Sequence, residues 1–251
     1  MDRTEYLALF MGADSESQKT EIIMAYLRAL HTDVNISLRK HVYDSGYTYT
    51  ITRRGDSDGW DKPFKITDEV IDALNFVKEK HEGQLRDNGS PYFKHILDVV
   101  DILIEDGSGW DDTLLAAVLH DTLEKTDATF DELKERFGDI AANTVELLVK
   151  AEGESYDDYT DRIFSDEGLE FRPLSLDISL KMSDKTNCHL KARGVILADR
   201  LANLRNLQSC GNPDKIREYI EETKRCILSR KIAPNLSNRI RSEINKLDKI
   251  D

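Results

Sequence analysis

His120 and Asp121 are the first residues in this chain that suggest chemistry. Adjacent imidazole and carboxylate groups both offer atoms that bind a divalent metal. Glu124 lies four residues after His120 and three after Asp121, so on a helix it projects from the same side, one turn further on. A carboxylate there is placed to act as a general acid or base beside a metal-activated water. The alternative for this segment alone is a chance His-Asp pair followed by a solvated helix end at Glu124-Lys125.

Two residues far apart in the sequence complete a possible metal site. His95 interrupts an apolar helical face, where a lone histidine is more often a core residue than a ligand. Asp199 lies in a strongly apolar stretch, and because burying a bare carboxylate is costly, it must be paired, for example with Arg200, or bind a metal. With His120 and Asp121 they predict an open site of two histidines and two aspartates from three helices.

The elements that position these residues are predicted to be helices, because apolar residues recur with helical spacing from residue 66 onward. Residues 152–190, which contain Pro173, are expected to hold a loop or short elements. The expected helices are one starting near 66–69, one after Pro91 that carries His95, one over 112–125, one from a capping box at Thr129 and Glu132 to Gly138, and others over 139–151, 191–209, 214–231 and 236–249. Asn203 and Asn206 follow Asp199 on the same side of the 191–209 helix.

Residues 1–65 differ from the rest. Their spacing predicts a helix over 18–31, a strand over 46–54 and a turn or linker at 55–59. They contain no chemical motif. The chain is therefore predicted to be mainly α, with a small N-terminal α/β appendage of unknown role before a helical domain over 66–251.

The composition excludes several classes of protein. The 251 residues carry a formal net charge of −13, which argues against a nucleic-acid binder with a uniformly basic surface. No apolar run approaches the ~18 residues needed to span a bilayer, and the N-terminus lacks the features of a signal peptide. The three cysteines have no C-x-x-C spacing, so reduced thiols in a cytoplasmic protein without a membrane role are expected.

The charge is unevenly distributed along the chain. Residues 98–170 carry a net charge of −17, whereas residues 171–251 carry +7. The simpler interpretation is that these segments form complementary solvated helix faces. The alternative is that some acidic groups bind a cation while the basic groups meet an anion.

Four motifs occur in a fixed order: His81-Glu82-Gly83-Gln84-Leu85-Arg86, Gly89-Ser90-Pro91-Tyr92-Phe93-Lys94-His95, Leu119-His120-Asp121-Thr122-Leu123-Glu124 and Leu197-Ala198-Asp199-Arg200-Leu201-Ala202-Asn203-Leu204-Arg205. The series resembles the HD-domain hydrolases of the Rel/Spo alarmone enzymes and their single-domain relatives, the small alarmone hydrolases. The resemblance covers about residues 67–210. The stretches around Phe137-Gly138 and at Gly153-Glu154-Ser155-Tyr156 are also similar to that family.

The resemblance implies an HD-domain helical bundle that holds one divalent ion, usually manganese. Its ligands would be His95, His120, Asp121 and Asp199. It also implies the reaction, which is removal of the 3′-diphosphate of guanosine tetra- or pentaphosphate as pyrophosphate, with a nucleotide as the small-molecule substrate.

The resemblance further implies roles around the metal. Glu124 matches the acid that handles the water or its proton, and Asn203 matches the asparagine near the ribose and 3′ phosphate, so both are expected to be catalytic. Arg86 matches the arginine that packs near guanine. Arg86, Asn203, Lys125 and Asn206 are the expected substrate-binding residues. His81 matches a position that is not a ligand and is interpreted as structural.

Three features depart from the family pattern. Lys125 replaces a second acid, Asp87-Asn88 replace basic and small residues that help to hold the base, and Asn206 replaces a small hydroxyl residue. Residues 1–65 have no recognised counterpart. Either that segment or the long stretch 165–190 is a candidate surface for a protein partner or a homo-oligomer.

Two other functions stay open on the sequence. One is an HD phosphohydrolase that acts on another phosphorylated nucleotide or cofactor. The other is a nucleotide-binding or partner-binding protein with little turnover, an alternative that Lys125 and the extra N-terminal segment keep open. Synthesis of the alarmone is not expected, because only about 40 residues follow the last motif helix.

Overall fold

The structure is a computed structural model that describes residues 36–43, 46–53, 62–66, 68–106, 111–165, 184–207, 212–230 and 232–248. The helix predicted over 18–31 and the turn predicted at 55–59 lie outside these residues. The strand predicted over 46–54 is confirmed as β2 (Gly46–Arg53).

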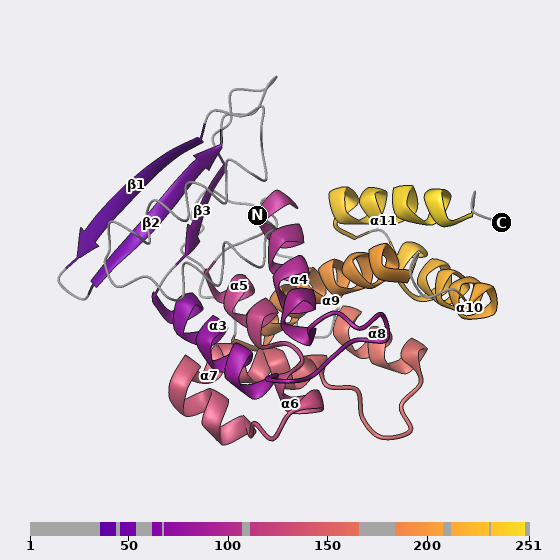
Figure 1. The fold of residues 1–251 in the computed structure, drawn as a ribbon, viewed down its shortest axis with the longest axis horizontal. Helices are drawn as coiled ribbons and strands as arrows, with labels where there is room; N and C mark the ends of the chain where they lie inside the picture. Colours follow the sequence, from indigo (N-terminus) through magenta and orange to yellow (C-terminus); the bar gives the residue numbers. More distant parts are fainter. Residues whose placement is uncertain are drawn as a thin grey trace.

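A three-stranded antiparallel sheet precedes the helices (Figure 1). Its order is β1 (Ile36–Tyr43), β2 and β3 (Lys62–Ile66), and β3 lies beside the helix α5 (Asp111–Leu119). Alternating β-branched and aromatic residues in β2 suit a paired strand. The first described helix starts two residues after β3, close to the predicted boundary at 65/66, and that division into domains stays a prediction.

The described chain after β3 is helical, which confirms the predicted helical bundle. Besides α5, its elements are α3 (Asp68–Lys80), α4 (Tyr92–Asp106), α6 (Thr122–Lys125), α7 (Phe130–Leu148), α8 (Tyr156–Phe164), α9 (Asp184–Leu207), α10 (Pro213–Thr223), the π-helical turn η1 (Lys224–Leu228) and α11 (Pro234–Leu247). No helix in the described ranges is long and apolar enough to cross a membrane.

Helix α9 forms the centre of the bundle and packs against α4, α5, α7, α8, α10 and α11 (Figure 1). Its apolar residues are buried on several sides; Ala198 and Leu201, which flank Asp199 and Arg200, are fully buried. Facing α9, α4 buries Ile96, Val99 and Leu103 completely. Each such side chain contributes roughly 1.5–3 kcal/mol on burial. The same packing fixes the positions of the polar residues that these two helices carry into the interior.

The N-cap half of the predicted capping box is present in α7, and the predicted glycine stop is a kink within that helix. Thr129 accepts a hydrogen bond from the backbone N–H of Glu132, at 3.2 Å, which caps the first turn. Gly138 has a φ of +83°, a conformation that glycine adopts without strain, and it kinks the helix there. The two predicted helices thus form the two halves of α7.

Two expectations about the helices are wrong. The helix expected over 112–125 is interrupted at His120-Asp121, where the Thr122 hydroxyl donates to the carbonyl of Leu119, at 2.7 Å. The region expected to hold a loop or short elements over 152–190 includes the start of α9, seven residues before the predicted 191. Apolar spacing did not reveal these changes because the side chains around residue 120 are apolar and those before 191 are mostly polar.

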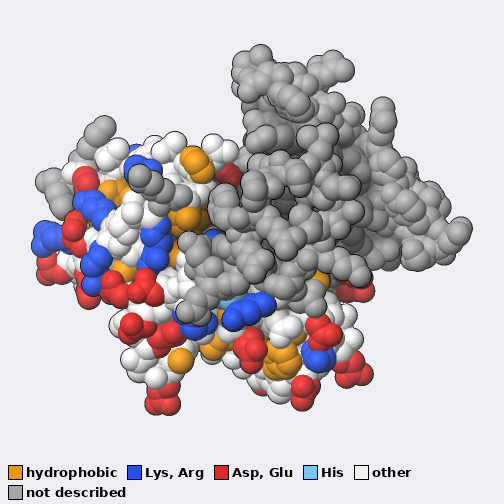
Figure 2. All heavy atoms as spheres, turned by 180° about the vertical axis from the view of Figure 1, so that it is seen from behind, with side chains coloured by type: hydrophobic (Ala, Val, Ile, Leu, Met, Phe, Trp, Pro, Cys, Tyr) orange, Lys and Arg blue, Asp and Glu red, His pale blue; other side chains and the backbone are white. Residues whose placement is uncertain are grey.

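The acidic middle and the basic C-terminal third meet as ion pairs. Arg225 lies 2.9 Å from Asp157, and Arg230 pairs with Asp161, which joins η1 and the loop after it to α8. Figure 2 shows basic and acidic side chains interspersed over the described surface on the side of α10 and α11. Complementary helix faces therefore pair part of the acidic middle with the basic C-terminal third. Cys188 and Cys226 are free thiols, as predicted, and Cys210 lies outside the described residues.

Candidate metal centre and substrate cavities

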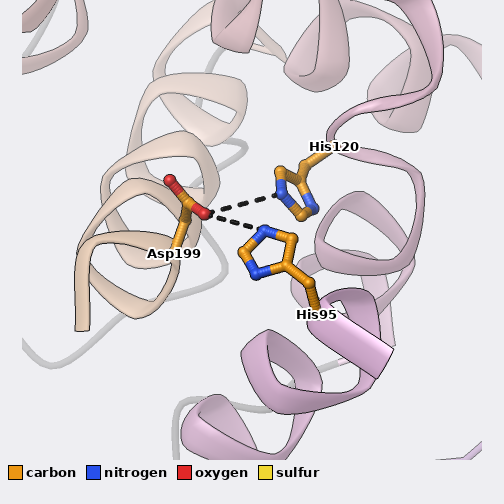
Figure 3. Close-up of side chains that lie close together, drawn as sticks. All are labelled: His95, His120 and Asp199. Carbon is orange, nitrogen blue, oxygen red and sulfur yellow. Dashed lines mark ion pairs between the residues drawn. The ribbon is translucent and has the colours of Figure 1, made fainter. Parts of the chain in front are cut away.

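Three of the four predicted metal ligands converge in the interior of the bundle (Figure 3). His95 comes from α4, His120 follows α5 and Asp199 lies in the middle of α9. Asp199 Oδ1 is 3.0 Å from His95 Nε2 and 3.8 Å from His120 Nε2, and one donor atom from each residue lies within 4.8 Å of the others. Residues more than 100 positions apart thus form one compact cluster.

Asp121 lies beside this cluster and bridges it to a lysine. Its Oδ2 is 3.1 Å from His120 Nε2 and 3.6 Å from His95 Nε2. Its Oδ1 lies 2.9 Å from the ammonium group of Lys125, and the hydroxyl of Tyr92 donates to Oδ2. All four predicted ligands are therefore brought together, but both oxygens of Asp121 already have partners.

The tautomer of His120 shows that this ring is suited to a metal. Its Nδ1 lies 2.8 Å from the carbonyl oxygen of Ala117, which can only accept, so Nδ1 carries the hydrogen of the neutral ring. In the neutral ring, Nε2 then directs its lone pair at the cluster, where it is buried and faces Asp121 Oδ2 at 3.1 Å. A histidine oriented by a backbone carbonyl in this way is the usual arrangement of an imidazole ligand. The residues present therefore fit a divalent cation.

Burial and charge act in opposite directions on the cluster. Burial lowers the pKa of His95, although Asp199 partly opposes that shift. Burial also opposes protonation of His120, but the carboxylates of Asp121 and Asp199 outweigh it and raise the pKa. Burial acts to raise the pKa of both carboxyl groups, yet His120 and His95 hold the pKa of Asp121 and of Asp199 below its ordinary value. Two ionised carboxylates in the interior attract a cation.

Glu124 borders a cavity of about 210 Å³ that also contacts His120, Asp121 and Asp199. It lies on α6, whose turn is closed by a hydrogen bond from the backbone N–H of Lys125 to the carbonyl of Asp121, at 2.9 Å. Although the longer helix is broken, this turn keeps the one-turn relation between Asp121 and Glu124. The exposed carboxylate of Glu124 is thus placed next to the cluster without belonging to it.

Asn203 connects the cluster to a second, larger cavity. Its amide donates to Asp199 Oδ1, at 2.8 Å, and its amide oxygen accepts from Arg86, at 2.6 Å. Arg86, Asn203, Asn206 and Lys125 all line this cavity of about 350 Å³. The four predicted substrate-binding residues thus share one space, and Lys125 and Asn203 border the smaller cavity as well.

Two other basic residues in the motifs have partners outside the cluster. Arg200, the alternative partner of Asp199, instead donates to Thr223 and Glu222, at 2.7 Å each, and lies over the ring of Tyr219, 3.6 Å from its centroid. Lys94 pairs with Asp98 on its own helix, at 2.8 Å.

His81 is structural, as interpreted from the sequence. It is buried, stacks on Tyr92 with 4.9 Å between ring centroids, and pairs with the side chain of Gln84, at 2.8 Å. Gln84 in turn donates to the backbone carbonyl of Lys125, at 3.0 Å. These contacts fix Tyr92 and the end of α6.

Sequence reasoning missed four tyrosines at the site. Tyr92 binds Asp121, Tyr219 lines both cavities, and Tyr156 and Tyr159 line the smaller one. Tyr92 stands in the motif next to Pro91, and this was an available signal. Tyr219 lies in a polar amphipathic helix, where one aromatic residue indicates packing rather than a site.

Comparisons with known proteins identify the class. A family model described as an HD domain matches residues 73–226, so the chain belongs to the HD-domain family. Its relatives include hydrolases of the Rel/Spo type, which confirms the resemblance seen in the motifs. The chain is 35% identical over 159 residues to the guanosine-3′,5′-bis(diphosphate) 3′-pyrophosphohydrolase MESH1 of Xenopus tropicalis, which covers 61% of this chain and 79% of that protein.

Longer relatives contain the same region. The chain is 34% identical over 151 residues to the bifunctional (p)ppGpp synthase/hydrolase SpoT of Escherichia coli, covering 60% of this chain but 20% of that protein. Among solved structures, a metazoan orthologue of SpoT described as hydrolysing ppGpp is similar with a TM-score of 0.56 and 23% identity, covering 72% of this chain and 96% of the other. That structural likeness supports the fold.

Proposed function

We propose that this chain hydrolyses the 3′-diphosphate of guanosine tetra- and pentaphosphate (ppGpp and pppGpp). Water attacks the phosphorus bonded to the ribose 3′-oxygen, the 3′-O–P ester bond breaks, and the 3′-oxygen takes up a proton, so the products are pyrophosphate and GDP or GTP. The main supporting observation is the convergence of His95, His120 and Asp199 at the smaller cavity, which Asn203 connects to the cavity of about 350 Å³. The larger cavity is within the usual size range of small-molecule sites. The named activity of the MESH1 and SpoT relatives supports the same substrate.

We infer that the resident cation is manganese and that His95, His120, Asp121 and Asp199 hold it. When bound, such an ion lowers the pKa of a water ligand and withdraws charge from a phosphoryl oxygen. The chemistry of the donor set supports the inference, because imidazole and carboxylate together suit a borderline divalent metal. The lone pair that His120 Nε2 directs at the cluster supports it as well.

The other residues would position the substrate and move protons. Glu124, at the edge of the smaller cavity, accepts a proton from the attacking water. Asn203 orients Asp199 and the ribose end of the nucleotide from the boundary between the cavities. Arg86, Lys125 and Asn206 line the larger cavity and are the proposed substrate contacts. Phosphoryl transfer depends mainly on such positioning and on charge compensation.

A panel assay tests the reaction. The purified chain is incubated with Mn²⁺ and ppGpp, pppGpp, and nucleotides that carry a single 2′- or 3′-phosphate, and pyrophosphate and orthophosphate are measured separately. Pyrophosphate from ppGpp, in amounts equal to the GDP formed, supports the proposal. Orthophosphate from a monophosphorylated cofactor would replace it with a different HD phosphohydrolase activity.

One observation favours a second candidate, a nucleotide-binding HD protein with little turnover. Lys125 occupies the position of the family's second acid, and its ammonium group is bound to Asp121. Binding of ppGpp in the panel without any release of pyrophosphate would support this candidate over hydrolysis.

Partners and location stay predictions. A cytoplasmic protein without nucleic-acid or membrane partners is expected, and a homo-oligomer or a protein partner would use 1–65 or 165–190. Most of the residues in these two segments lie outside the described part of the chain.

A further inference from the structure

Lys125 is held at the candidate metal centre by contacts on both its backbone and its side chain. Its ammonium group lies 2.9 Å from Asp121 Oδ1 and 5.0 Å from the centroid of the Tyr92 ring, and it donates to the Tyr92 hydroxyl. Its backbone carbonyl accepts from Gln84, and its backbone N–H donates to the carbonyl of Asp121. This lysine is therefore built into the site.

The contact places the positive charge of Lys125 next to Asp121, which faces the two histidines of the cluster. Asp121 Oδ2 lies within 3.6 Å of both His95 Nε2 and His120 Nε2, whereas Oδ1 faces the ammonium group. A cation in the cluster would share this carboxylate with Lys125. It would also be repelled by the lysine, because unit charges a few ångströms apart interact by several kcal/mol where the effective dielectric constant is about 20.

We propose that Lys125 is an internal counter-ion to Asp121 which a divalent cation must displace, and that this exchange lowers the affinity of the chain for its metal. The ammonium group has space to move, because 40% of its side chain is exposed and it lines both cavities. A second acid at this position would act in the opposite direction and strengthen cation binding.

Titration of the metal-free protein with Mn²⁺, without nucleotide, tests the proposal. Lys125→Met removes the charge and keeps the length of the side chain, so Mn²⁺ should bind about tenfold tighter, since a neighbouring like charge shifts an ionic equilibrium by about one to three logarithmic units. Lys125→Arg retains the charge and should bind Mn²⁺ as the parent does. Unchanged or weaker binding by a folded Lys125→Met variant would overturn the proposal.

Lys94→Met is a matched control. Lys94 also pairs with an aspartate four residues away, and 44% of its side chain is exposed, but its partner Asp98 lies outside the cluster. This variant should bind Mn²⁺ within twofold of the parent. An equal gain in affinity in Lys94→Met would show a general effect of net charge and would contradict a specific role for Lys125.

A crystal structure of the protein with Mn²⁺ and no nucleotide tests the displacement of Lys125 independently. The ammonium group should lie more than 4 Å from Asp121 Oδ1 in the metal-loaded protein, and a retained pair at 2.9 Å would overturn the exchange. A lower Mn²⁺ requirement for hydrolysis by Lys125→Met is a further consequence, which rests on the proposed function. Because the titration and the structure use no nucleotide, failure of ppGpp hydrolysis would leave their outcome unaffected.

Discussion

The two ends of the site are built differently. At the inner end, the side chains of His95 and His120 are 1% and 6% exposed and come from helices that form the core. At the outer end, Leu85 is 64% exposed, and the Asp87–Lys215 pair has side chains that are 86% and 51% exposed. The inner end has its geometry fixed by packing, whereas the outer end rests on surface contacts. Under the proposed function, the core would therefore set the chemistry, and the choice of nucleotide would depend on residues that can vary at little cost to the fold.

Asp199→Asn should have the largest effect, because it breaks the inner end. The amide removes a negative charge that both histidines face, so metal binding and hydrolysis should be lost together, with activity falling at least ~1,000-fold, as expected when a metal that supplies several kcal/mol of transition-state stabilisation is removed. Metal content by mass spectrometry and pyrophosphate release measure the two effects.

Asp121→Asn is the companion variant and should behave in the same way. A thermal melting curve for each variant separates loss of the metal from loss of the fold. Retention of one metal per chain in both folded variants would contradict the proposed ligand set.

Glu124→Gln should separate chemistry from metal binding. The side chain borders the smaller cavity but contributes no atom to the cluster, so metal content should stay at the parent level. Turnover should fall by about 100-fold or more, which is the usual contribution of a general acid or base. Rapid-quench measurement of pyrophosphate release reports the rate, and full activity in this variant would remove Glu124 from the proposed mechanism.

Arg86→Ala tests the connection between the two ends. Arg86 donates to Asn203, which donates to Asp199. The substitution therefore removes a proposed substrate contact and weakens the hydrogen bonds that orient Asp199. A rise in KM of about tenfold with a smaller fall in kcat is expected, since a lost hydrogen bond to a charged group costs about 1.5–3 kcal/mol.

A double-mutant cycle with Asn203→Ala distinguishes the two contributions of Arg86. If the residues act together, their combined effect on kcat/KM is smaller than the sum of the single effects. Independent, additive effects would show that the 2.6 Å contact between them carries no function.

The inner end could be predicted from the sequence because its polar residues lie within apolar segments. His95 and Asp199 are polar residues within apolar helical faces, and such residues need a partner or a ligand. Their convergence followed from the order of the motifs. The periodicity of apolar residues likewise predicted the helical bundle, since α4 and α9 bury long apolar faces.

The connections between elements were beyond sequence reasoning. Arg86 and Asn203 are 117 residues apart, and only the packing of α9 brings them together. The break before α6 was missed because a single hydroxyl contact at Thr122 interrupts an apolar run that has helical spacing. Arg200 was a plausible partner for Asp199 by position, but its side chain leaves α9 in another direction, toward α10.

Lys215→Met should have the smallest effect and would sharpen the contrast between the two ends. Lys215 and Asp87 both line the larger cavity and lie 2.7 Å apart. Hydrogen bonding to the Lys215 ammonium group lowers the pKa of Asp87. A carboxyl group whose pKa is lowered in the folded state stabilises the protein at pH values above its unfolded-state pKa. That stabilisation is lost as the pH falls through its folded-state pKa. Because both side chains are largely solvated, this contribution should be too small to shift the denaturant midpoint at neutral pH.

The pKa of Asp87 should still respond. In Lys215→Met, an NMR titration should show this carboxyl group protonating at a higher pH than in the parent, close to the ordinary value for aspartate. An unchanged titration would mean that the ion pair does not persist in solution. A large fall in stability would mean that the outer end is as firmly built as the inner one. The contrast between the two ends holds only if Asp87 titrates differently while the unfolding midpoint stays the same.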